Sequence, residues 1–358
     1  MPKYKNRKVA VITGSTGGHF FPGLAVGEDL RERYGAAVKF FVPGREYIFK
    51  WLEKKGFEYS VIPPCRITAS DILSPFRFLC VFLKACAVLL HGRYGVVFIT
   101  GSYATVPFLL AAKLCGIKTV VHEQNVRMGK VTRLSTLIAD RITITFPSLS
   151  GYPAGRTEVT GFPLIRDFAS GPTKAGALKE LGFSPDILTV LVFGGSQGSD
   201  FLNRLVCDNF SFFREQSLQF IHLTGSSPGE IQALYDKNGI PAKVFRFYVE
   251  MSRLYSAADC VICRGGAGTL AEINEWKIPA IVVPYPHAGA HQECNALFFS
   301  ERGCSMTVAQ NDSSLRNFSV IFGDFLMSRK KMAEKMSKVS IVDKEGKTAF
   351  VVSRYISK

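Results

Sequence analysis

The chain opens in the same way twice, about half its length apart. Val9 and Thr189 each begin an apolar, β-branched run that leads into glycines and then into a segment with helical spacing. A buried strand followed by a glycine turn and a helix is typical of a phosphate-binding motif. The glycines let the backbone turn tightly and approach an anion, and the helix N-terminus supplies N–H groups. Two such motifs in 358 residues predict two nucleotide-binding domains that face one cleft.

Charge and composition narrow the class of partner. The formal net charge is +15, and 47% of the residues are hydrophobic. A well-packed globular protein with this charge is expected to bind anionic partners: phosphate-rich substrates, nucleic acid or a membrane surface. The sequence has neither an RNA-stacking signature nor a helix-turn-helix pattern, so nucleic acid is not expected among them.

The cysteines predict neither disulfides nor a metal site. There are nine, an odd number, and most lie inside apolar runs, which favours reduced thiols in a cytosol. Cys260 and Cys263 form a C-x-x-C pair inside a predicted strand, where residues three apart point to opposite faces of the sheet. The basic start MPKYKNRK passes straight into a strand, so a signal peptide is not expected.

One strongly apolar segment, 76–90, stands out in the first half of the chain. It reads FRFLCVFLKACAVLL and carries Arg77 and Lys84, whereas a membrane-spanning helix needs roughly 20 apolar residues. It is expected either to pack on the sheet as a buried helix or to form an interfacial surface for a membrane with anionic headgroups.

Strands alternate with helices along both halves of the chain. This order predicts an α/β fold with two Rossmann-like, doubly wound parallel sheets. The expected domains are 1–163 and 164–340, joined by a Gly- and Pro-punctuated hinge at 157–174, and the sequence leaves open whether the tail 341–358 returns to the first domain. The predicted strands are 8–13, 37–42, 59–63, 96–100, 118–122, 141–145, 188–193, 218–223, 242–246, 259–263 and 279–283. The predicted helices are 21–34, 45–55, 76–91, 105–115, 130–138, 200–213, 229–237, 251–257, 268–276 and 290–301, with a basic helical tail from about 325.

The glycine loops exclude two common nucleotide chemistries. Neither the loop 14–18 nor the loop 194–198 has the G-x-G-x-x-G spacing of a dinucleotide site, and neither carries a Walker lysine. Dehydrogenase activity and nucleoside triphosphate hydrolysis are therefore not expected.

A third glycine turn, 264–269, opens another predicted helix that carries Glu272 in its first turn. A carboxylate there can accept two hydrogen bonds from a ribose diol, although such a glutamate can also merely complement the helix dipole. The following strand leads to His287, His291, Gln292 and Asn295, whose neutral donors and acceptors suit the hydroxyls of a sugar.

The segment CRGGAGTLAEINEWKIPAIVVPYPHAGAHQECNAL resembles the nucleotide-sugar region of the MurG glycosyltransferases. Four further segments match that family in order: GSTGGHFFP, GSYATVP, HEQN and GGSQG. The resemblance runs from about residue 8 to 310. It implies the GT-B fold and the transfer of N-acetylglucosamine from UDP-N-acetylglucosamine to undecaprenyl-pyrophosphoryl-muramoyl-pentapeptide.

The resemblance also implies site residues. The first domain would bind the acceptor and the second domain the donor. Carried over from the family, the catalytic candidates are His19 and Glu123, and the acceptor-binding candidates are Thr16, Gly17, Gly18, Tyr103 and Asn125. The donor-binding candidates are Arg166, Ser196, Gln197, Tyr248, Met251, Thr269, Glu272, His291, Gln292 and Asn295.

By this resemblance the reaction inverts the anomeric carbon and needs one base. His19 is the first choice because its unperturbed pKa lies near neutral pH; it could instead cap or bind phosphate, and Glu123 is the second choice. No Asp-x-Asp occurs in the chain, so no metal and no cofactor are expected. Backbone N–H groups and Arg166 would carry the diphosphate charge instead.

The chain departs from the family pattern in several places. Ser15 and Ser102 stand where the family has glycine. Phe162 and Thr132 replace asparagine, the arginine of the hinge motif lies one place later, and His291 replaces a glutamine. These changes leave the exact donor and acceptor contacts open.

The expected location is peripheral, on the cytoplasmic side of the plasma membrane, with anionic lipids and other cell-wall synthesis proteins as partners. The alternatives are another GT-B enzyme, such as a diacylglycerol glycosyltransferase or a nucleotide-sugar epimerase, and a non-catalytic assembly protein that binds a nucleotide sugar.

Overall fold

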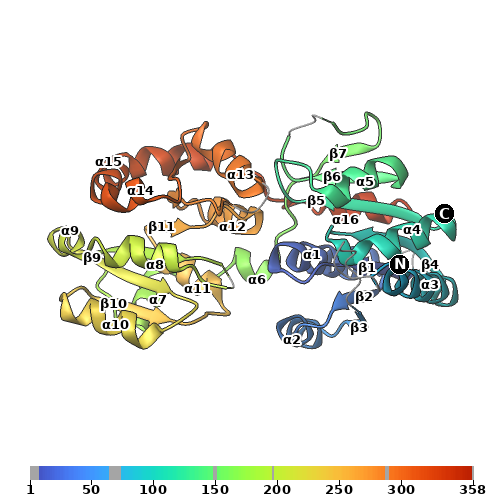
Figure 1. The fold of residues 1–358 in the computed structure, drawn as a ribbon, viewed down its shortest axis with the longest axis horizontal. Helices are drawn as coiled ribbons and strands as arrows, with labels where there is room; N and C mark the ends of the chain where they lie inside the picture. Colours follow the sequence, from blue (N-terminus) through green and yellow to red (C-terminus); the bar gives the residue numbers. More distant parts are fainter. Residues whose placement is uncertain (1–7, 64–73, 148–150, 196, 287–289, 357–358) are drawn as a thin grey trace. The chain divides into compact units, whose positions relative to one another are not determined.

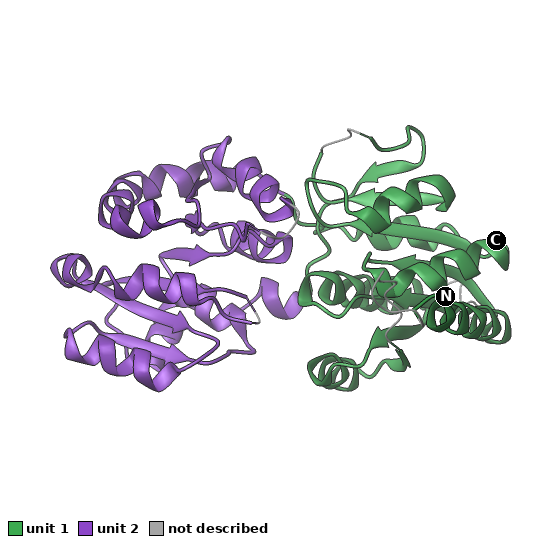
Figure 2. Cartoon of the chain, viewed as in Figure 1, with its two compact units in different colours: residues 1–165, 341–358 green, residues 166–340 purple. Residues whose placement is uncertain are grey.

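The chain forms two compact units in a computed structural model that describes residues 8–63, 74–147, 151–195, 197–286 and 290–356 (Figure 1). Unit 1 comprises residues 1–165 and 341–358, and unit 2 comprises residues 166–340 (Figure 2). Each unit is built on one parallel sheet, so the predicted α/β class with two doubly wound sheets is confirmed.

Unit 1 contains a seven-stranded parallel sheet in the order β3-β2-β1-β4-β5-β6-β7. Its first strand, β1, has an apolar run because helices cover both faces of the sheet: Val9, Ala10, Val11 and Ile12 are all fully buried. The chain reverses its direction of growth between β1 and β4, which creates a topological switch point at the carboxyl ends of these two strands. The strands are β1 (Lys8–Ile12), β2 (Ala37–Pro43), β3 (Glu58–Ile62), β4 (Tyr94–Ile99), β5 (Lys118–Glu123), β6 (Arg141–Ile144) and β7 (Thr157–Val159).

Helices from both ends of the chain cover this sheet. The C-terminal segment returns to unit 1, where α16 packs against α1, β5 and β6. Phe162 bridges to Val342, and the Thr348 hydroxyl donates to the Thr160 hydroxyl at 2.8 Å. The helices are α1 (Gly17–Tyr34), α2 (Glu46–Lys54), α3 (Ser74–Gly92), η1 (Tyr103–Thr105), α4 (Val106–Leu114), α5 (Lys130–Ile138) and α16 (Lys347–Ser353).

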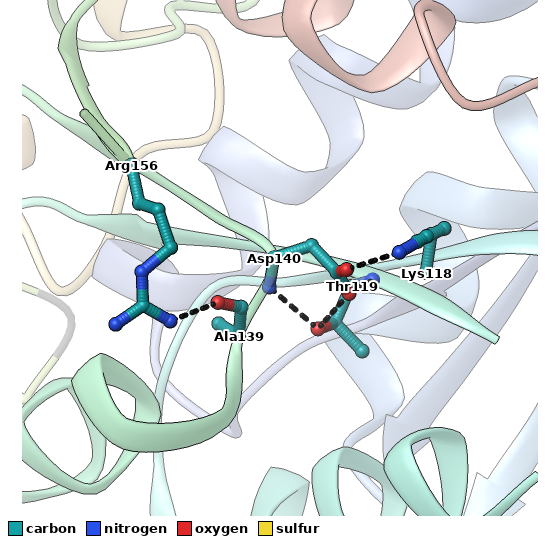
Figure 3. A network of polar contacts seen from close by, with 5 residues as sticks. All are labelled: Lys118, Thr119, Ala139, Asp140 and Arg156. Atoms are coloured by element: carbon teal, nitrogen blue, oxygen red, sulfur yellow. Dashed lines mark hydrogen bonds and ion pairs between the residues drawn. The ribbon is translucent and has the colours of Figure 1, made fainter. Parts of the chain in front are cut away.

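A polar network fixes the amino-terminal edge of the sheet, opposite the switch-point loops (Figure 3). Asp140, just before β6, accepts from the Lys118 ammonium at 2.6 Å and from the Thr119 backbone N–H at 3.0 Å. The Arg156 guanidinium donates to the Ala139 carbonyl at 3.0 Å. These bonds tie the starts of β5, β6 and β7 together, at the edge opposite the loops that follow β1 and β4.

Unit 2 repeats the plan with a six-stranded parallel sheet in the order β10-β9-β8-β11-β12-β13, so its switch point lies between β8 and β11. One core cluster holds phenylalanines from the two ends of the unit, including Phe213, Phe318 and Phe322. The strands are β8 (Leu188–Phe193), β9 (Leu218–Leu223), β10 (Ala242–Phe245), β11 (Cys260–Cys263), β12 (Ala280–Val282) and β13 (Ser305–Thr307). The helices are α6 (Arg166–Ala169), α7 (Lys174–Leu181), α8 (Asp200–Cys207), α9 (Phe210–Glu215), α10 (Pro228–Lys237), α11 (Met251–Ala257), α12 (Ala267–Trp276), α13 (His291–Ser300), α14 (Asp312–Arg316) and α15 (Phe318–Ser337).

Helix α3 extends beyond the predicted bounds at both ends. Within the described residues it is the one helix that is long and apolar enough to cross a membrane, judged by length and composition alone. Only 17% of its 18-residue apolar stretch is buried, so the helix packs on unit 1 through a narrow face. Val81, Ala85 and Leu89 join the core of unit 1, while the opposite face is exposed.

Several predicted elements need correction. Residues 157–159, assigned to the hinge, form the edge strand β7 instead. Helix α1 begins at Gly17, four residues early, because the N–H groups of His19 and Phe20 both donate to the Thr16 carbonyl and close a first turn there. The predicted helix 200–213 is two helices. Asn209 interrupts it by donating its side-chain amide to the Leu205 carbonyl, which competes with the backbone ladder.

Candidate active site

In unit 1 the loops after β1, β4 and β5 meet at the carboxyl edge of the sheet. The loop after β1 touches the loop after β4 so closely that a Cβ at Gly14 would lie 2.6 Å from the Cβ of Ser102. Gly14 therefore has to be glycine. Ser102 itself has φ +81°, a backbone conformation that side chains other than glycine rarely adopt. The glycine loop is thus held against its neighbour by close backbone packing.

His19 lies in the first turns of α1, and its ring orientation is fixed. Its Nδ1 lies 2.6 Å from the Thr100 carbonyl oxygen, which can only accept, so Nδ1 carries a proton. In the neutral imidazole, Nε2 is then the nitrogen that accepts a proton. The Gln124 amide donates to the same carbonyl at 2.8 Å, which ties His19 to the loop after β5.

Glu123 ends β5 and is 3% exposed. Its Oε1 accepts from the backbone N–H and the side-chain amide of Asn125, each at 3.0 Å. Its Oε2 accepts from the Gly129 N–H at 2.9 Å and from the Thr132 hydroxyl at 2.5 Å. A carboxylate accepts about four hydrogen bonds, and here the protein provides four, three from the loop after β5 and one from α5. This geometry favours a role in holding the 125–132 segment over the role of a base.

The remaining acceptor-side candidates lie on the same edge. Thr16 is the N-cap residue of α1, and its side chain makes no capping hydrogen bond; Gly17 and Gly18 form the first helical residues. Tyr103 opens the short helix η1 and is 47% exposed. Unit 1 therefore gathers all its sequence-predicted residues around the β1–β4 switch point.

In unit 2 a buried arginine joins the loops after β8, β11 and β12. Arg264 follows β11 and donates to the Ser199 hydroxyl at 2.6 Å and to the Val283 carbonyl at 3.1 Å. Ser199 is also the N-cap of α8, where its hydroxyl accepts from the Leu202 N–H. The positive charge is therefore placed beside the glycine loop of this unit. The candidate Ser196 lies outside the described residues, and Gln197 is exposed on that loop.

Glu272 lies in the second turn of α12, not in the first turn as predicted, because the helix already begins at Ala267. Its Oε2 accepts from the Tyr255 hydroxyl at 2.5 Å. Burial raises the pKa of Glu272 to about 7, and the hydrogen bond from Tyr255 acts in the opposite direction. This carboxylate changes charge near neutral pH, which is common for groups that bind or react.

The residues of α13 divide into loop-holding and exposed groups. Asn295 is fully buried and donates its side-chain amide to the Gly265 carbonyl at 3.1 Å, which fixes the third glycine turn. The Gln292 side-chain oxygen accepts from the Tyr285 N–H at 2.9 Å. His291 is the first residue of α13 and is half-buried. Asn295 therefore acts on the turn, whereas His291 remains accessible to a ligand.

The other donor-side candidates are more widely placed. Thr269 lies half-buried in the first turn of α12, and Met251 begins α11 next to the loop that carries Tyr248. Tyr248 packs edge-on against Phe245, with ring centroids 5.1 Å apart. Arg166 begins α6 and is exposed. Among the described residues no cluster of His, Cys, Asp and Glu could hold a metal ion.

Three residues of these sites were missed from the sequence. Arg264 carried a usable signal, since it is a charged residue at the buried end of an apolar strand. Thr132 was noted only as a departure from the family, and its hydroxyl supplies one of the four donors to Glu123. Tyr255 gave no signal, because its contact with Glu272 joins two separate helices.

Comparison with known proteins identifies the family. Residues 9–144 match the glycosyltransferase family 28 N-terminal domain, and residues 189–350 match the family 28 C-terminal domain. The UDP-N-acetylglucosamine–N-acetylmuramyl-(pentapeptide) pyrophosphoryl-undecaprenol N-acetylglucosamine transferase of Psychromonas ingrahamii is 31% identical over 98% of this chain and all of its own length. The enzyme of the same name from Protochlamydia amoebophila is 34% identical over 82% of this chain and 80% of its own.

A solved structure agrees with these relatives. The crystal structure of Acinetobacter baumannii MurG matches with a TM-score of 0.79 and 24% identity, over 97% of this chain and 99% of that one. This likeness confirms the predicted GT-B class, and the two relatives confirm the predicted family. The chain belongs to the MurG family of glycosyltransferases, within glycosyltransferase family 28.

Proposed function

We propose that this protein transfers N-acetylglucosamine from UDP-N-acetylglucosamine to the 4-hydroxyl of a lipid-linked muramoyl-pentapeptide, the step named in its relatives. The observation that carries the proposal is the similarity over essentially the whole chain, which includes both units and both glycine-loop sites. A likeness to one unit alone would support nucleotide binding but not transfer.

The reaction needs a base for the acceptor hydroxyl, and His19 is the group best suited to it. Because Nδ1 donates to the Thr100 carbonyl, Nε2 takes the proton from the 4-hydroxyl as its oxygen attacks the anomeric carbon. The new C–O bond forms while the bond to the diphosphate breaks, and UDP leaves with the electron pair. Attack opposite the leaving group inverts the anomeric configuration. Glu123 serves this chemistry indirectly, by fixing the loop beside His19.

The donor is assigned to unit 2. The Glu272 carboxylate accepts from the ribose hydroxyls, and the Arg264 guanidinium with the N–H groups of the glycine loop faces the diphosphate. As the diphosphate departs it gains charge, which a fixed cation and fixed N–H groups stabilise without reorganisation. We propose that these groups act without a bound metal, since the chain has no Asp-x-Asp motif.

Unit 1 is proposed to dock on a membrane through α3. Phe76, Leu79, Leu83 and Leu90 are spaced by three, four and seven residues, so they form one stripe, and each is 49–64% exposed. Arg77 and Lys84 adjoin this stripe, so the helix presents an apolar face with cations for anionic headgroups. The association is peripheral and, we propose, on the cytoplasmic side, which suits free thiols at every cysteine in the described part of the chain.

An acceptor-dependent assay tests the transfer. Labelled UDP-N-acetylglucosamine is mixed with a short-chain, water-soluble lipid I analogue, with and without EDTA, and the label on the acceptor is counted. We expect transfer that is unchanged by EDTA and that requires the muramoyl-pentapeptide. Transfer only to diacylglycerol, epimerisation of the free donor, or no reaction with any polyprenyl acceptor would each overturn the proposal.

Sedimentation with vesicles tests the docking surface separately. We expect binding to vesicles that contain phosphatidylglycerol, and its loss when Leu79 and Leu83 are both replaced by glutamate. Met327→Glu is the matched control, since Met327 is an 80% exposed apolar residue on α15 of unit 2. Equal binding of all three proteins would contradict the role of α3.

A further inference from the structure

The carboxylate of Glu272 is held by a hydrogen bond to one of its two oxygens. Its Oε2 accepts from the Tyr255 hydroxyl at 2.5 Å, and within the described part of the chain its Oε1 has no hydrogen-bond donor. A carboxylate held through a single oxygen can keep one fixed orientation and still offer the other oxygen to a ligand.

The Tyr255 ring packs against side chains of two other elements, one of which is held in turn by a third. It is 1% exposed, and it packs edge-on against Phe193 at the end of β8, with centroids 6.1 Å apart. It also stacks on Trp276 of α12 at 6.3 Å and an interplanar angle of 28°. The Trp276 indole donates to the Phe168 carbonyl of α6 at 2.8 Å. The hydroxyl that reaches Glu272 is therefore preorganised, because the ring has no space to turn.

We propose that Tyr255 is a positioning residue of the donor site, which orients Glu272 so that its second oxygen accepts from the ribose of the nucleotide sugar. The inference rests on the proposed function, since it assumes that Glu272 meets the ribose. It goes further because it assigns recognition of the ribose to two residues, Tyr255 on α11 and Glu272 on α12, in place of Glu272 alone.

The pair makes donor affinity depend on pH in a way that Tyr255 controls. Burial raises the pKa of Glu272 to about 7 and the Tyr255 hydroxyl lowers it, so loss of that hydroxyl moves the pKa further up. Cys263 of β11 also lies close, and burial raises the pKa of its thiol, so it stays neutral there; Arg264 follows it on the loop. The other elements packed on α12 are α6 and α13, whose charged and titratable residues are Arg166, Asp167, His291, Glu293 and Cys294, and α11 itself adds Arg253.

Calorimetric titration with UDP-N-acetylglucosamine from pH 6 to pH 9 tests the proposal, because this donor has no phosphate group that titrates in that range. For the parent protein we expect Kd to rise below about pH 7. For Tyr255→Phe we expect Kd to be about 3–10-fold higher at pH 7, with recovery to within about twofold at pH 9, because a charge-assisted hydrogen bond to Glu272 is lost.

Two further variants separate positioning from general damage. Tyr235→Phe removes another buried hydroxyl of unit 2, one that contacts His222 at 3.1 Å, and it should leave the pH profile unchanged. In a Glu272→Gln background, Tyr255→Phe should change Kd by less than about twofold, because the two residues act as a unit.

The outcomes distinguish this inference from the proposed function. If the parent protein binds no UDP-N-acetylglucosamine at any pH, the proposed function fails and this inference with it. If the parent binds and Glu272→Gln weakens binding while Tyr255→Phe shows the parent's pH profile, only the inference is overturned. An equal loss at every pH for Tyr255→Phe also overturns it, since a purely structural defect would act that way.

Discussion

The two units place a glutamate at the same edge of the same kind of sheet and use it differently. Glu123 of unit 1 accepts four hydrogen bonds from the segment 125–132, whereas Glu272 of unit 2 accepts one, from Tyr255. The number of donors that the fold supplies therefore decides the role of each carboxylate. A saturated one organises its loop, and an unsaturated one can meet a ligand.

The histidines of the two units also differ in whether the fold leaves them accessible. His122 in unit 1 and His222 in unit 2 are fully buried, and burial lowers the pKa of each to about 3. Both contact neutral groups, such as Thr143 for His122 and Tyr235 for His222. His19 is half-buried on a loop-facing turn, and the Thr100 carbonyl sets which ring nitrogen carries the proton. Of these three histidines, His19 is the one that combines a fixed tautomer with access to the sheet edge.

The largest expected effect comes from removing that histidine. His19→Ala should lower kcat by about 10²–10⁴-fold, the usual contribution of a general base. The Kd for UDP-N-acetylglucosamine should not change, because the donor is assigned to unit 2. Turnover with the soluble acceptor and calorimetry with the donor measure the two quantities. If His19→Ala kept the kcat of the parent protein, His19 would not be the base. The contrast between saturated and accessible groups would then be weaker.

The second effect concerns stability and compares the glutamates directly. Glu123→Ala leaves four donors without their acceptor, so we expect a loss of about 3 kcal/mol in the free energy of unfolding. Glu272→Ala leaves only the Tyr255 hydroxyl, and the loss should stay within about 1 kcal/mol. Urea unfolding of both variants measures this difference. Equal losses would break the distinction between the two carboxylates.

The long central strands and the glycine loops were predictable because each depends on residues that are adjacent in the sequence. A strand buried on both faces gives a continuous apolar run, as in β1 and β8, and the glycines that follow mark the sheet edge where ligands bind. The edge strands β7 and β13 were missed. Each has three residues and is only partly buried, so neither leaves an apolar run in the sequence.

The pairing of side chains within the sites could not be predicted in the same way. The sequence pointed to Glu272 and Glu123 through motifs, but their partners Tyr255 and Thr132 lie on separate elements, α11 and α5. A hydrogen bond between two elements depends on how those elements pack, and hydrophobic periodicity does not encode that distance. The sequence therefore located both carboxylates without showing which one was saturated.

The third effect concerns donor affinity. Glu272→Ala should raise the Kd for UDP-N-acetylglucosamine by about 10–100-fold at pH 8, where the parent carboxylate is ionised and accepts from the ribose. Below pH 7 the parent carboxyl is protonated and loses acceptor strength, so the gap between parent and variant should narrow. Calorimetry at pH 6 and pH 8 tests both statements. A 2′,3′-dideoxyribose donor is the control and should bind both proteins equally.

The smallest effect concerns backbone strain, which also differs between the units. In unit 2 the glycine loop places Gly195 and Gly198 at positive φ, whereas unit 1 places Ser102 at φ +81° and ψ +144°. Ser102→Gly should raise the free energy of unfolding by about 1 kcal/mol, because glycine adopts this conformation without strain.

Ser102→Ala separates strain from the loss of the hydroxyl, since alanine keeps the Cβ that causes the strain. We expect the alanine variant to match the parent within about 0.5 kcal/mol in urea unfolding. If the glycine variant is no more stable than the alanine variant, the packing of the Ser102 Cβ against Gly14 compensates for the strain. The loop of unit 1 would then be held by contact with its neighbour, as Glu123 is held by its four donors.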